Sequence, residues 1–216
     1  MIYINGDGFA AASYAASNFS WSSEDGNHAL RGRLIHPKNV SVSFGNIISL
    51  ILHQPHKIEA WQFNVHSKIF REIYRAIDCN NLSYVIITWP SLYKDEICVD
   101  NVYYPFSFNA IDKLNYSKQI KDAMFERMTQ FQMSEVQTKF ENDINQLCEI
   151  LKSKDIKHLM IPSELKLPTG NANWLWTDET IVSWATKNKL LNSNGFLNKE
   201  GHQNLVKIIF DNLTNQ

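Results

Sequence analysis

The sequence lacks most features that would tie a protein to an oxidising compartment, a membrane or a nucleic acid. It has only three cysteines in 216 residues and no Cys-x-x-Cys pair, which argues against a disulfide framework. No apolar run approaches the roughly 20 residues that span a bilayer. The first residues also lack the basic segment of a signal peptide. We therefore expect a protein made in the cytoplasm, without a signal peptide or membrane span.

The sequence also lacks an excess of charge of either sign. Lysine and arginine number 21 and the acidic residues 22, so the formal net charge of -1 offers no global attraction to nucleic acid. Asp95, Glu96, Asp100 and Asp112 lie close together in sequence, but their spacing does not match an EF-hand loop. No cysteine and histidine spacing matches a zinc site. We expect no nucleic-acid partner, no metal and no cofactor.

Apolar, β-rich runs alternate along the chain with helical patterns. This order predicts a single domain over residues 1–216, a three-layer α/β/α sandwich with a parallel sheet and flavodoxin-like topology. An aromatic-rich, irregular insertion is expected at about residues 92–115. The predicted strands are residues 1–4, 58–63, 84–89 and 158–161. The predicted helices are 44–52, 66–77, 116–152 (as one helix or two) and 201–213, and 10–16 could begin another.

The first predicted strand runs into Gly6-Asp7-Gly8, where a hydrolytic α/β domain often presents its nucleophile. Gly8 has no side chain and cannot attack a carbonyl. We expect Gly8 to adopt a positive φ angle in a tight turn. We also expect Asp7 to accept hydrogen bonds from nearby backbone amides and so lock this turn.

Three segments occur in a characteristic order. They are Gly6-Asp7, the run Val-Ile-Ile-Thr-Trp-Pro-Ser at 85–91 with Asp95-Glu96 after it, and Asn-Gly-Phe-Leu-Asn-Lys-Glu-Gly-His at 194–202. This order resembles the SGNH/GDSL hydrolase superfamily, in particular its phage and bacterial branch. The resemblance implies an SGNH-hydrolase-like fold. It also implies ester hydrolysis by a serine, with a C-terminal histidine and aspartate as its base system and a glycine and an asparagine as oxyanion donors.

Residue by residue, the family's catalytic positions are degenerate in this chain. The serine position is Gly8, the aspartate position is Asn194, and the histidine position is Phe196 or Leu197, depending on alignment. The middle block near residues 89–92 contains no asparagine, and His66 falls near the asparagine that follows the second strand. The resemblance therefore implies no catalytic residue at the family positions.

Two functions from different classes follow. The first is a catalytically degenerate binding or structural module, with a phage virion component or a glycan-contacting protein as candidate roles and an assembly protein or a glycan as partner. The alternative is an active esterase or acyl-sugar hydrolase with a relocated site, in which Ser13 is the nucleophile and His202 the base. A nucleotide-binding protein is less favoured, because Gly6-x-Gly8 lacks the third glycine of a dinucleotide fingerprint.

If the protein binds a ligand in a parallel sheet, the carboxyl ends of the strands are the expected place. The candidate contacts there are Asp7, Gly8, His66, Trp89 and Ser91. A second candidate is the segment Asn-Ala-Asn-Trp-Leu-Trp at 171–176. Its indoles and amides suit sugar stacking and hydrogen bonding. The same tryptophans could instead cover the edge of the sheet, and the sequence leaves both interpretations open.

Overall fold

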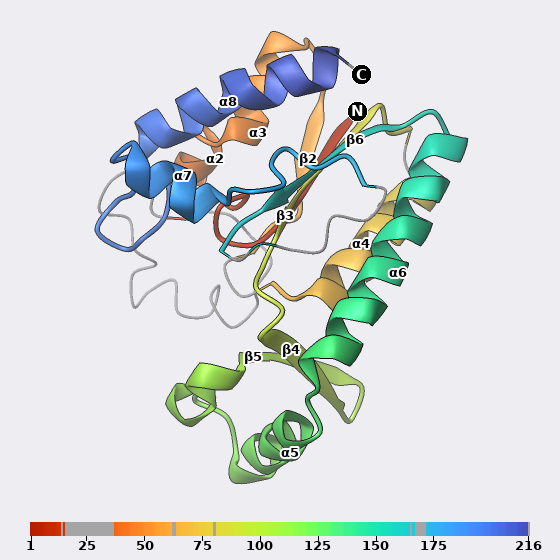
Figure 1. Cartoon of the computed structure of the whole chain (residues 1–216), viewed down its shortest axis with the longest axis vertical. Coiled ribbons are helices and arrows are strands. Elements are labelled where there is room, and N and C mark those ends of the chain that lie inside the picture. Colours follow the sequence, from red (N-terminus) through yellow and green to blue (C-terminus); the bar gives the residue numbers. More distant parts are fainter. Residues whose placement is uncertain are drawn as a thin grey trace.

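The computed structural model describes residues 1–13, 15, 37–61, 64–79, 81–164, 166 and 172–215. Its centre is a parallel sheet of four strands in the order β2-β1-β3-β6 (Figure 1). The strands are β1 (Ile2–Gly6), β2 (His56–Ile58), β3 (Tyr84–Trp89) and β6 (Lys157–Pro162). This is the order of the first four strands of the flavodoxin-like topology.

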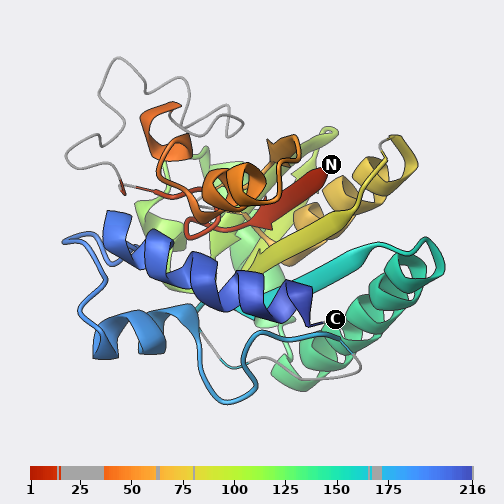
Figure 2. The same ribbon diagram turned by 90° about the horizontal axis from the view of Figure 1, so that it is seen from above.

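Helices cover both faces of the sheet, as Figure 2 shows from above. On one face lie α3 (Phe44–Ile51), α7 (Ile181–Lys187) and α8 (Lys199–Thr214), with the short α2 (Pro37–Val40) preceding α3. On the other face lie α4 (His66–Cys79) and α6 (Met133–Ser153). The predicted three-layer α/β/α class with a parallel sheet is confirmed.

Successive strand residues feed two separate cores, because side chains alternate between the faces of a sheet. Ile2, Ile4 and Ile86 pack with buried residues of α3, α7 and α8. Tyr3 and Val85 pack instead with buried residues of α4 and α6. Every residue of β1, and every residue of β3 after Tyr84, is buried, as expected for strands covered on both sides.

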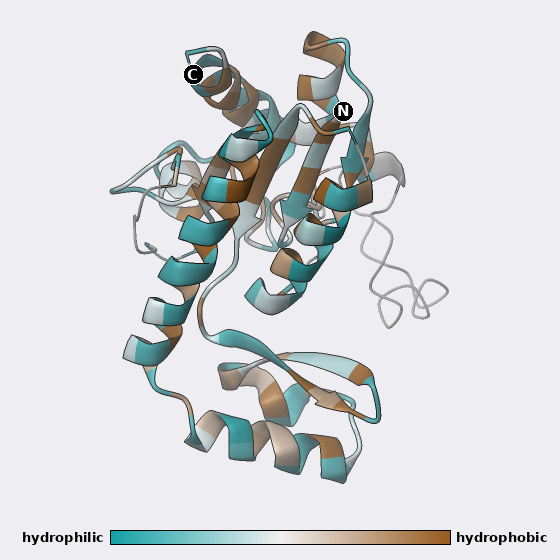
Figure 3. Ribbon diagram, turned by 90° about the vertical axis from the view of Figure 1, so that its right-hand side faces the viewer, coloured by the Kyte–Doolittle hydropathy of each residue, from teal (hydrophilic) through white to brown (hydrophobic). Residues whose placement is uncertain are grey.

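The segment between β3 and α6 forms a small unit of its own. It contains β4 (Lys94–Val99), β5 (Val102–Ser107), the 3-10 helix η2 (Phe108–Lys113) and α5 (Lys118–Thr129). Phe106, Ile111 and Met124 form its core. Figure 3 places this unit beyond the end of the sheet towards which β3 runs, below the helical layers.

This segment is more regular than the sequence pattern predicts. β4 and β5 pair as an antiparallel hairpin, with Val99 opposite Val102. Asp100 and Asn101 between them have φ angles of 51° and 62°, the left-handed conformations of a two-residue type I′ turn. Asp-Asn is a weaker turn signal than Asn-Gly or Asp-Gly, so the hairpin was not apparent from the sequence.

Two other expectations near the sheet differ from the structure. β2 ends at Ile58, although the amides of Glu59 and Trp61 still donate to the Ile4 and Gly6 carbonyls at 2.9 and 3.0 Å. The rest of that predicted strand, residues 62 and 63, lies outside the described residues. Residues 8–13 form hydrogen-bonded turns instead of beginning a helix.

α3 and α4 cover the predicted helices at 44–52 and 66–77, whereas α2 and α7 were not predicted. The long helical stretch after residue 116 is two helices, α5 and α6, and α8 covers the predicted C-terminal helix. None of the described helices is long and apolar enough to cross a membrane.

Candidate functional site

The turn after β1 lies at the carboxyl end of the sheet and depends on Gly6. Gly6 has a φ of +137°, and a Cβ built on it would lie 2.1 Å from the Thr88 Oγ1 atom of β3. Any side chain at this position would therefore meet both backbone strain and a collision. The predicted positive φ at Gly8 is wrong, because the left-handed residue of this turn is Gly6.

Asp7 fixes the same turn through its carboxylate, as predicted. Its Oδ1 atom accepts a hydrogen bond from the Phe9 amide at 3.1 Å and one from the Thr88 hydroxyl at 2.9 Å. The Asp7 amide in turn donates to Thr88 Oγ1 at 3.2 Å. Only 1% of the residue is exposed, so the carboxylate bridges β1 and β3 beneath the surface.

Burial raises the pKa of the Asp7 carboxyl above its usual range. The nearby Lys94 opposes this shift, Glu164 adds to it, and the hydroxyls of Ser163 and Thr88 lower the pKa again. Lys94 and Glu164 themselves form an ion pair of 3.0 Å between the start of β4 and the end of β6. The strand ends therefore hold a buried carboxyl beneath an ion pair.

The space next to Gly8 is filled by the ring of Phe196. A Cβ built on Gly8 would lie 2.3 Å from Phe196 Cε1, well inside van der Waals contact. The same ring packs on Phe9, with centroids 5.4 Å apart and planes at 58°. Phe196 is held in its loop by its amide, which donates to Asn192 Oδ1 at 3.2 Å, and by its carbonyl, which accepts from the Asn192 amide at 2.7 Å. Asn194 lies in the same loop and is exposed.

His202, the fallback base, lies in α8 and is fully buried. Its ring stacks on Phe44 with centroids 6.0 Å apart, and its Nδ1 accepts the Phe44 amide at 3.4 Å. Within the described part of the chain, its Nε2 has no hydrogen-bond partner. Burial lowers the pKa of His202 to about 3, so the imidazole is neutral at physiological pH.

Ser13, the fallback nucleophile, is 7% exposed, and its amide donates to the Gly8 carbonyl at 2.9 Å. Neither ring nitrogen of His202 is hydrogen-bonded to it. Among the residues described, Ser13 and His202 therefore do not form the hydrogen-bonded pair that an activated nucleophile needs.

His66 and Trp89 lie near the strand ends but face the core. Their rings stack at 5.8 Å, and His66 meets Phe140 edge-on at 4.8 Å. His66 Nε2 donates to the Pro90 carbonyl at 2.9 Å, because that oxygen can only accept. Burial lowers the pKa of His66 to about 3. Trp89 is fully buried and its indole N–H donates to Met160 Sδ at 3.2 Å.

Ser91, the last candidate contact, is 6% exposed and accepts the Tyr93 amide at 3.3 Å. The structure thus brings Asp7, Gly8, Trp89 and Ser91 to the same end of the sheet, and His66 begins the helix beside it. Each side chain present is engaged in packing or in intramolecular hydrogen bonds.

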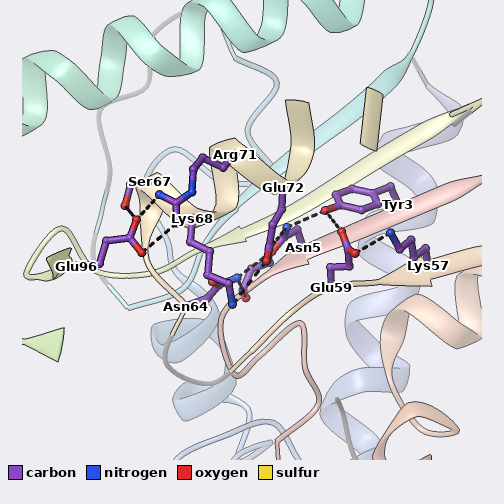
Figure 4. Close-up of polar contacts among 11 residues, drawn as sticks. Tyr3, Asn5, Lys57, Glu59, Asn64, Ser67, Lys68, Arg71, Glu72 and Glu96 are labelled. Atoms are coloured by element: carbon purple, nitrogen blue, oxygen red, sulfur yellow. Dashed lines mark hydrogen bonds and ion pairs between the residues drawn. The ribbon is translucent and has the colours of Figure 1, made fainter. Parts of the chain in front are cut away.

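A polar network that the sequence pattern does not predict joins β1 to α4 (Figure 4). The Tyr3 hydroxyl donates to Glu59 at 2.7 Å, and the Asn5 amide donates to the Tyr3 oxygen at 2.9 Å and to Glu72 at 3.0 Å. Burial and the carboxylate of Glu59 raise the pKa of Tyr3. Two lysines balance the carboxylates, Lys57 against Glu59 and Lys68 against Glu72. The only sequence signal for this network was the polar Asn5 within a strand that is buried on both faces.

A second polar cluster joins α4 to the hairpin (Figure 4). Arg71 forms a two-pronged ion pair with Glu96 of β4, and the Ser67 hydroxyl donates to the same carboxylate at 2.6 Å. The Arg71 guanidinium also lies 4.2 Å from the centroid of the Tyr103 ring. The Glu96 side chain is only 5% exposed, so this contact is largely shielded from water.

Comparisons with known proteins assign no family. No protein-family model matches the sequence, and no curated protein matches it. Among solved structures, the psychrotrophic esterase EstA from Pseudoalteromonas sp. is similar over 99% of this chain and 96% of its own, with 10% identity and a TM-score of 0.49. That esterase was crystallised inhibited by monoethylphosphonate. At this identity and TM-score, the likeness assigns neither an activity nor a site to this chain.

In chemical terms, the turn after β1 offers a buried acid and, beside Gly8, closely packed aromatic rings. Within the described ranges, no group of three or more histidine, cysteine, aspartate or glutamate residues is arranged to hold a metal ion. Acyl transfer requires a nucleophile that is hydrogen-bonded to a base, and hydrogen-bond donors that point towards the developing oxyanion. Around Gly8, the described residues supply instead a phenyl ring.

Proposed function

We propose that this chain is a non-catalytic binding or structural module built on a parallel α/β framework. One observation carries the proposal: the ring of Phe196 occupies the space beside Gly8 where a nucleophilic side chain would stand. A residue at position 8 with any side chain would have to displace that ring. The packing therefore favours a protein in which the space beside Gly8 belongs to the hydrophobic core and not to an active site.

The pKa values of His66 and His202 support the same conclusion. A general base works best with a pKa near the operating pH. His66 and His202 each have a pKa of about 3, and each ring stacks on an aromatic neighbour. These histidines therefore contribute shape and packing, and their lowered pKa values do not suit a general base.

We therefore expect partners to bind the outer surface of the protein. Tyr93, Val102 and Tyr103 are each more than 40% exposed, and all three lie on or next to the β4–β5 hairpin. Exposed aromatic side chains are typical anchors of protein interfaces. A component of a larger assembly, such as a phage particle, and a glycan-contacting protein are the roles proposed for this surface and its surroundings.

Hydrolysis of a short-chain 4-nitrophenyl ester by the purified full chain tests this proposal. We expect no turnover above that of buffer, and no covalent adduct in the mass spectrum after incubation with a fluorophosphonate serine probe. Turnover that survives Gly8→Ala but is abolished by Ser13→Ala, together with a probe adduct on Ser13, would establish the esterase alternative. Ser91→Ala is the matched control, because Ser91 is a similarly buried serine at the same end of the sheet.

A further inference from the structure

A groove of about 430 Å³ lies between α7 and α8. Its lining combines four polar or charged side chains with a tryptophan and two aliphatic residues. The residues that line it are Trp184, Asn188, Leu190, Glu200, Asn204, Lys207 and Ile208. None of these residues belongs to the strand-end site described above.

Two helical stripes form the walls. Trp184 and Asn188 are four residues apart on α7 and its C-cap, so they share one face. Glu200, Asn204 and Lys207 follow one another by four and three residues on α8 and likewise share a face. α8 therefore presents a row of polar side chains to the groove, and α7 presents an indole with an amide at its C-cap.

These polar side chains are available to a ligand. Within the described part of the chain, the side chains of Glu200, Asn204 and Lys207 make no hydrogen bond or ion pair. The indole N–H of Trp184 has no acceptor there either. Asn188 donates through Nδ2 to the Trp184 carbonyl at 2.8 Å, which leaves its Oδ1 as an acceptor.

The walls are also fixed in place. Trp176 stacks against Trp184 with centroids 5.6 Å apart, so the Trp-rich segment of the sequence supports the aromatic wall. Thr180 and Ser183 close the start of α7 with a capping box. A Cβ on Gly201 would lie 2.8 Å from the Leu190 carbonyl oxygen, so α8 packs closely against Leu190, a lining residue of the groove. A preformed site loses little conformational entropy when it binds.

We propose that this groove binds a neutral oligosaccharide; the assignment deepens the proposed binding function and rests on it. The face of an indole covers the apolar face of a sugar ring, and amide, carboxylate and ammonium groups bind its hydroxyls. Glu200 and Lys207 carry opposite charges, so the groove offers no net attraction to an anionic chain. This set of groups matches an uncharged polyol better than a phosphate, a carboxylate ligand or an apolar peptide.

A binding assay with defined sugars tests the proposal. The full chain is labelled with 5-fluorotryptophan, the fluorine signal of Trp184 is assigned with Trp184→Phe, and maltotetraose, cellotetraose and chitotetraose are titrated as probes. We expect at least one of them to shift that signal with a Kd of about 1 mM or tighter. Asn204→Ala should weaken this binding about fivefold or more, consistent with loss of a hydrogen bond.

Asn212→Ala is the matched control, because Asn212 lies on the same helix and its amide is bonded to the Ile208 carbonyl at 2.9 Å. It should bind as the wild type does. The proposal is overturned if none of the three sugars binds, if Asn204→Ala binds normally, or if only a heparin tetrasaccharide binds. An ester assay on the same preparation separates the two proposals: missing sugar binding without hydrolysis refutes the groove alone, whereas hydrolysis refutes the non-catalytic function.

Discussion

The Cε1 atom of Phe196 lies 2.3 Å from the place where a Cβ of residue 8 would stand. Gly8 is therefore required by its neighbour's size and not by its own backbone angle. The contact joins the first turn of the chain to the loop that precedes α8. It explains why a glycine in this position is compatible with a well-packed fold, and it fills the space beside Gly8 at the end of the sheet where parallel α/β proteins bind ligands.

Replacement of Asp7 should change stability and leave ligand binding at the α7–α8 groove unaltered. Asp7→Ala removes the acceptor of the buried Phe9 amide and Thr88 hydroxyl, which costs on the order of 1–3 kcal/mol for each group left unpaired. Asp7→Asn keeps an oxygen in that place and should be far milder. Thermal melts of both variants check this, and an Asp7→Ala protein that melts like the wild type would contradict it.

The pH dependence of Asp7→Asn should reveal the buried charge. The pKa of Asp7 is raised in the folded state, so its contribution to stability is fully present below the unfolded pKa and is lost as the pH rises through the folded pKa. The variant should therefore gain stability relative to the wild type as the pH rises above the unfolded aspartate pKa of about 4. Urea unfolding at several pH values measures this difference; a difference independent of pH would show that the carboxyl is not perturbed.

Acid should destabilise the protein through His66 and His202, whose pKa values are lowered in the folded state. The pKa values of His66 and His202 fall from 6.5 to about 3 on folding, so the unfolded chain binds more protons between these values. The stability that these neutral rings confer is present above about pH 6.5 and declines towards pH 3, by about 1.4 kcal/mol per pH unit for each ring.

His202→Gln isolates one of these contributions. At neutral pH the variant should be the less stable protein, because it loses the stacking on Phe44, and the gap should narrow as the pH falls below about 6.5. His53→Gln serves as the control, because His53 is exposed. Parallel pH profiles for wild type and His202→Gln would mean that folding does not lower the pKa of His202.

Arg71→Met should loosen the hairpin without unfolding the sheet. It leaves the nearly buried Glu96 with only the Ser67 hydroxyl, and breaking a buried ion pair from one side is costly. Hydrogen exchange in β4 and β5 should accelerate about tenfold or more while exchange in β1 and β3 stays unchanged. Lys139→Met, which breaks the exposed pair with Asp143, should alter neither region, whereas uniform acceleration across the sheet would argue against a separately anchored hairpin.

The sequence predicted the fold where the local pattern and the environment agree. The run at 84–89 is continuous and β-branched because β3 lies in the middle of the sheet, and its observed bounds match the prediction. β2 was placed too late, because an edge strand of three half-buried or exposed residues carries a weak pattern. The sequence did not decide whether residues 116–152 form one helix or two. In the structure, three non-helical residues separate α5 from α6.

The candidate site was predictable in position but not in packing. Asp7, Gly8, Trp89 and Ser91 reach the carboxyl end of the sheet because each follows or ends a parallel strand. The ring that covers Gly8 comes from the far end of the chain, and no local pattern specifies such a contact. The groove between α7 and α8 had a local signal, the spacing of Glu200, Asn204 and Lys207, but its partner wall depends on how the two helices pack.

A double-mutant cycle on Gly8 and Phe196 tests the closed strand end most directly. Gly8→Ala alone should destabilise the protein by about 1–3 kcal/mol through overpacking, and Phe196→Ala alone should do so through a cavity. In the double variant the new methyl group enters the space that the ring has left. The double variant should then lose less unfolding free energy than the sum of the two single losses, by about 1 kcal/mol or more. Strictly additive losses would show that Phe196 does not fill the space beside Gly8.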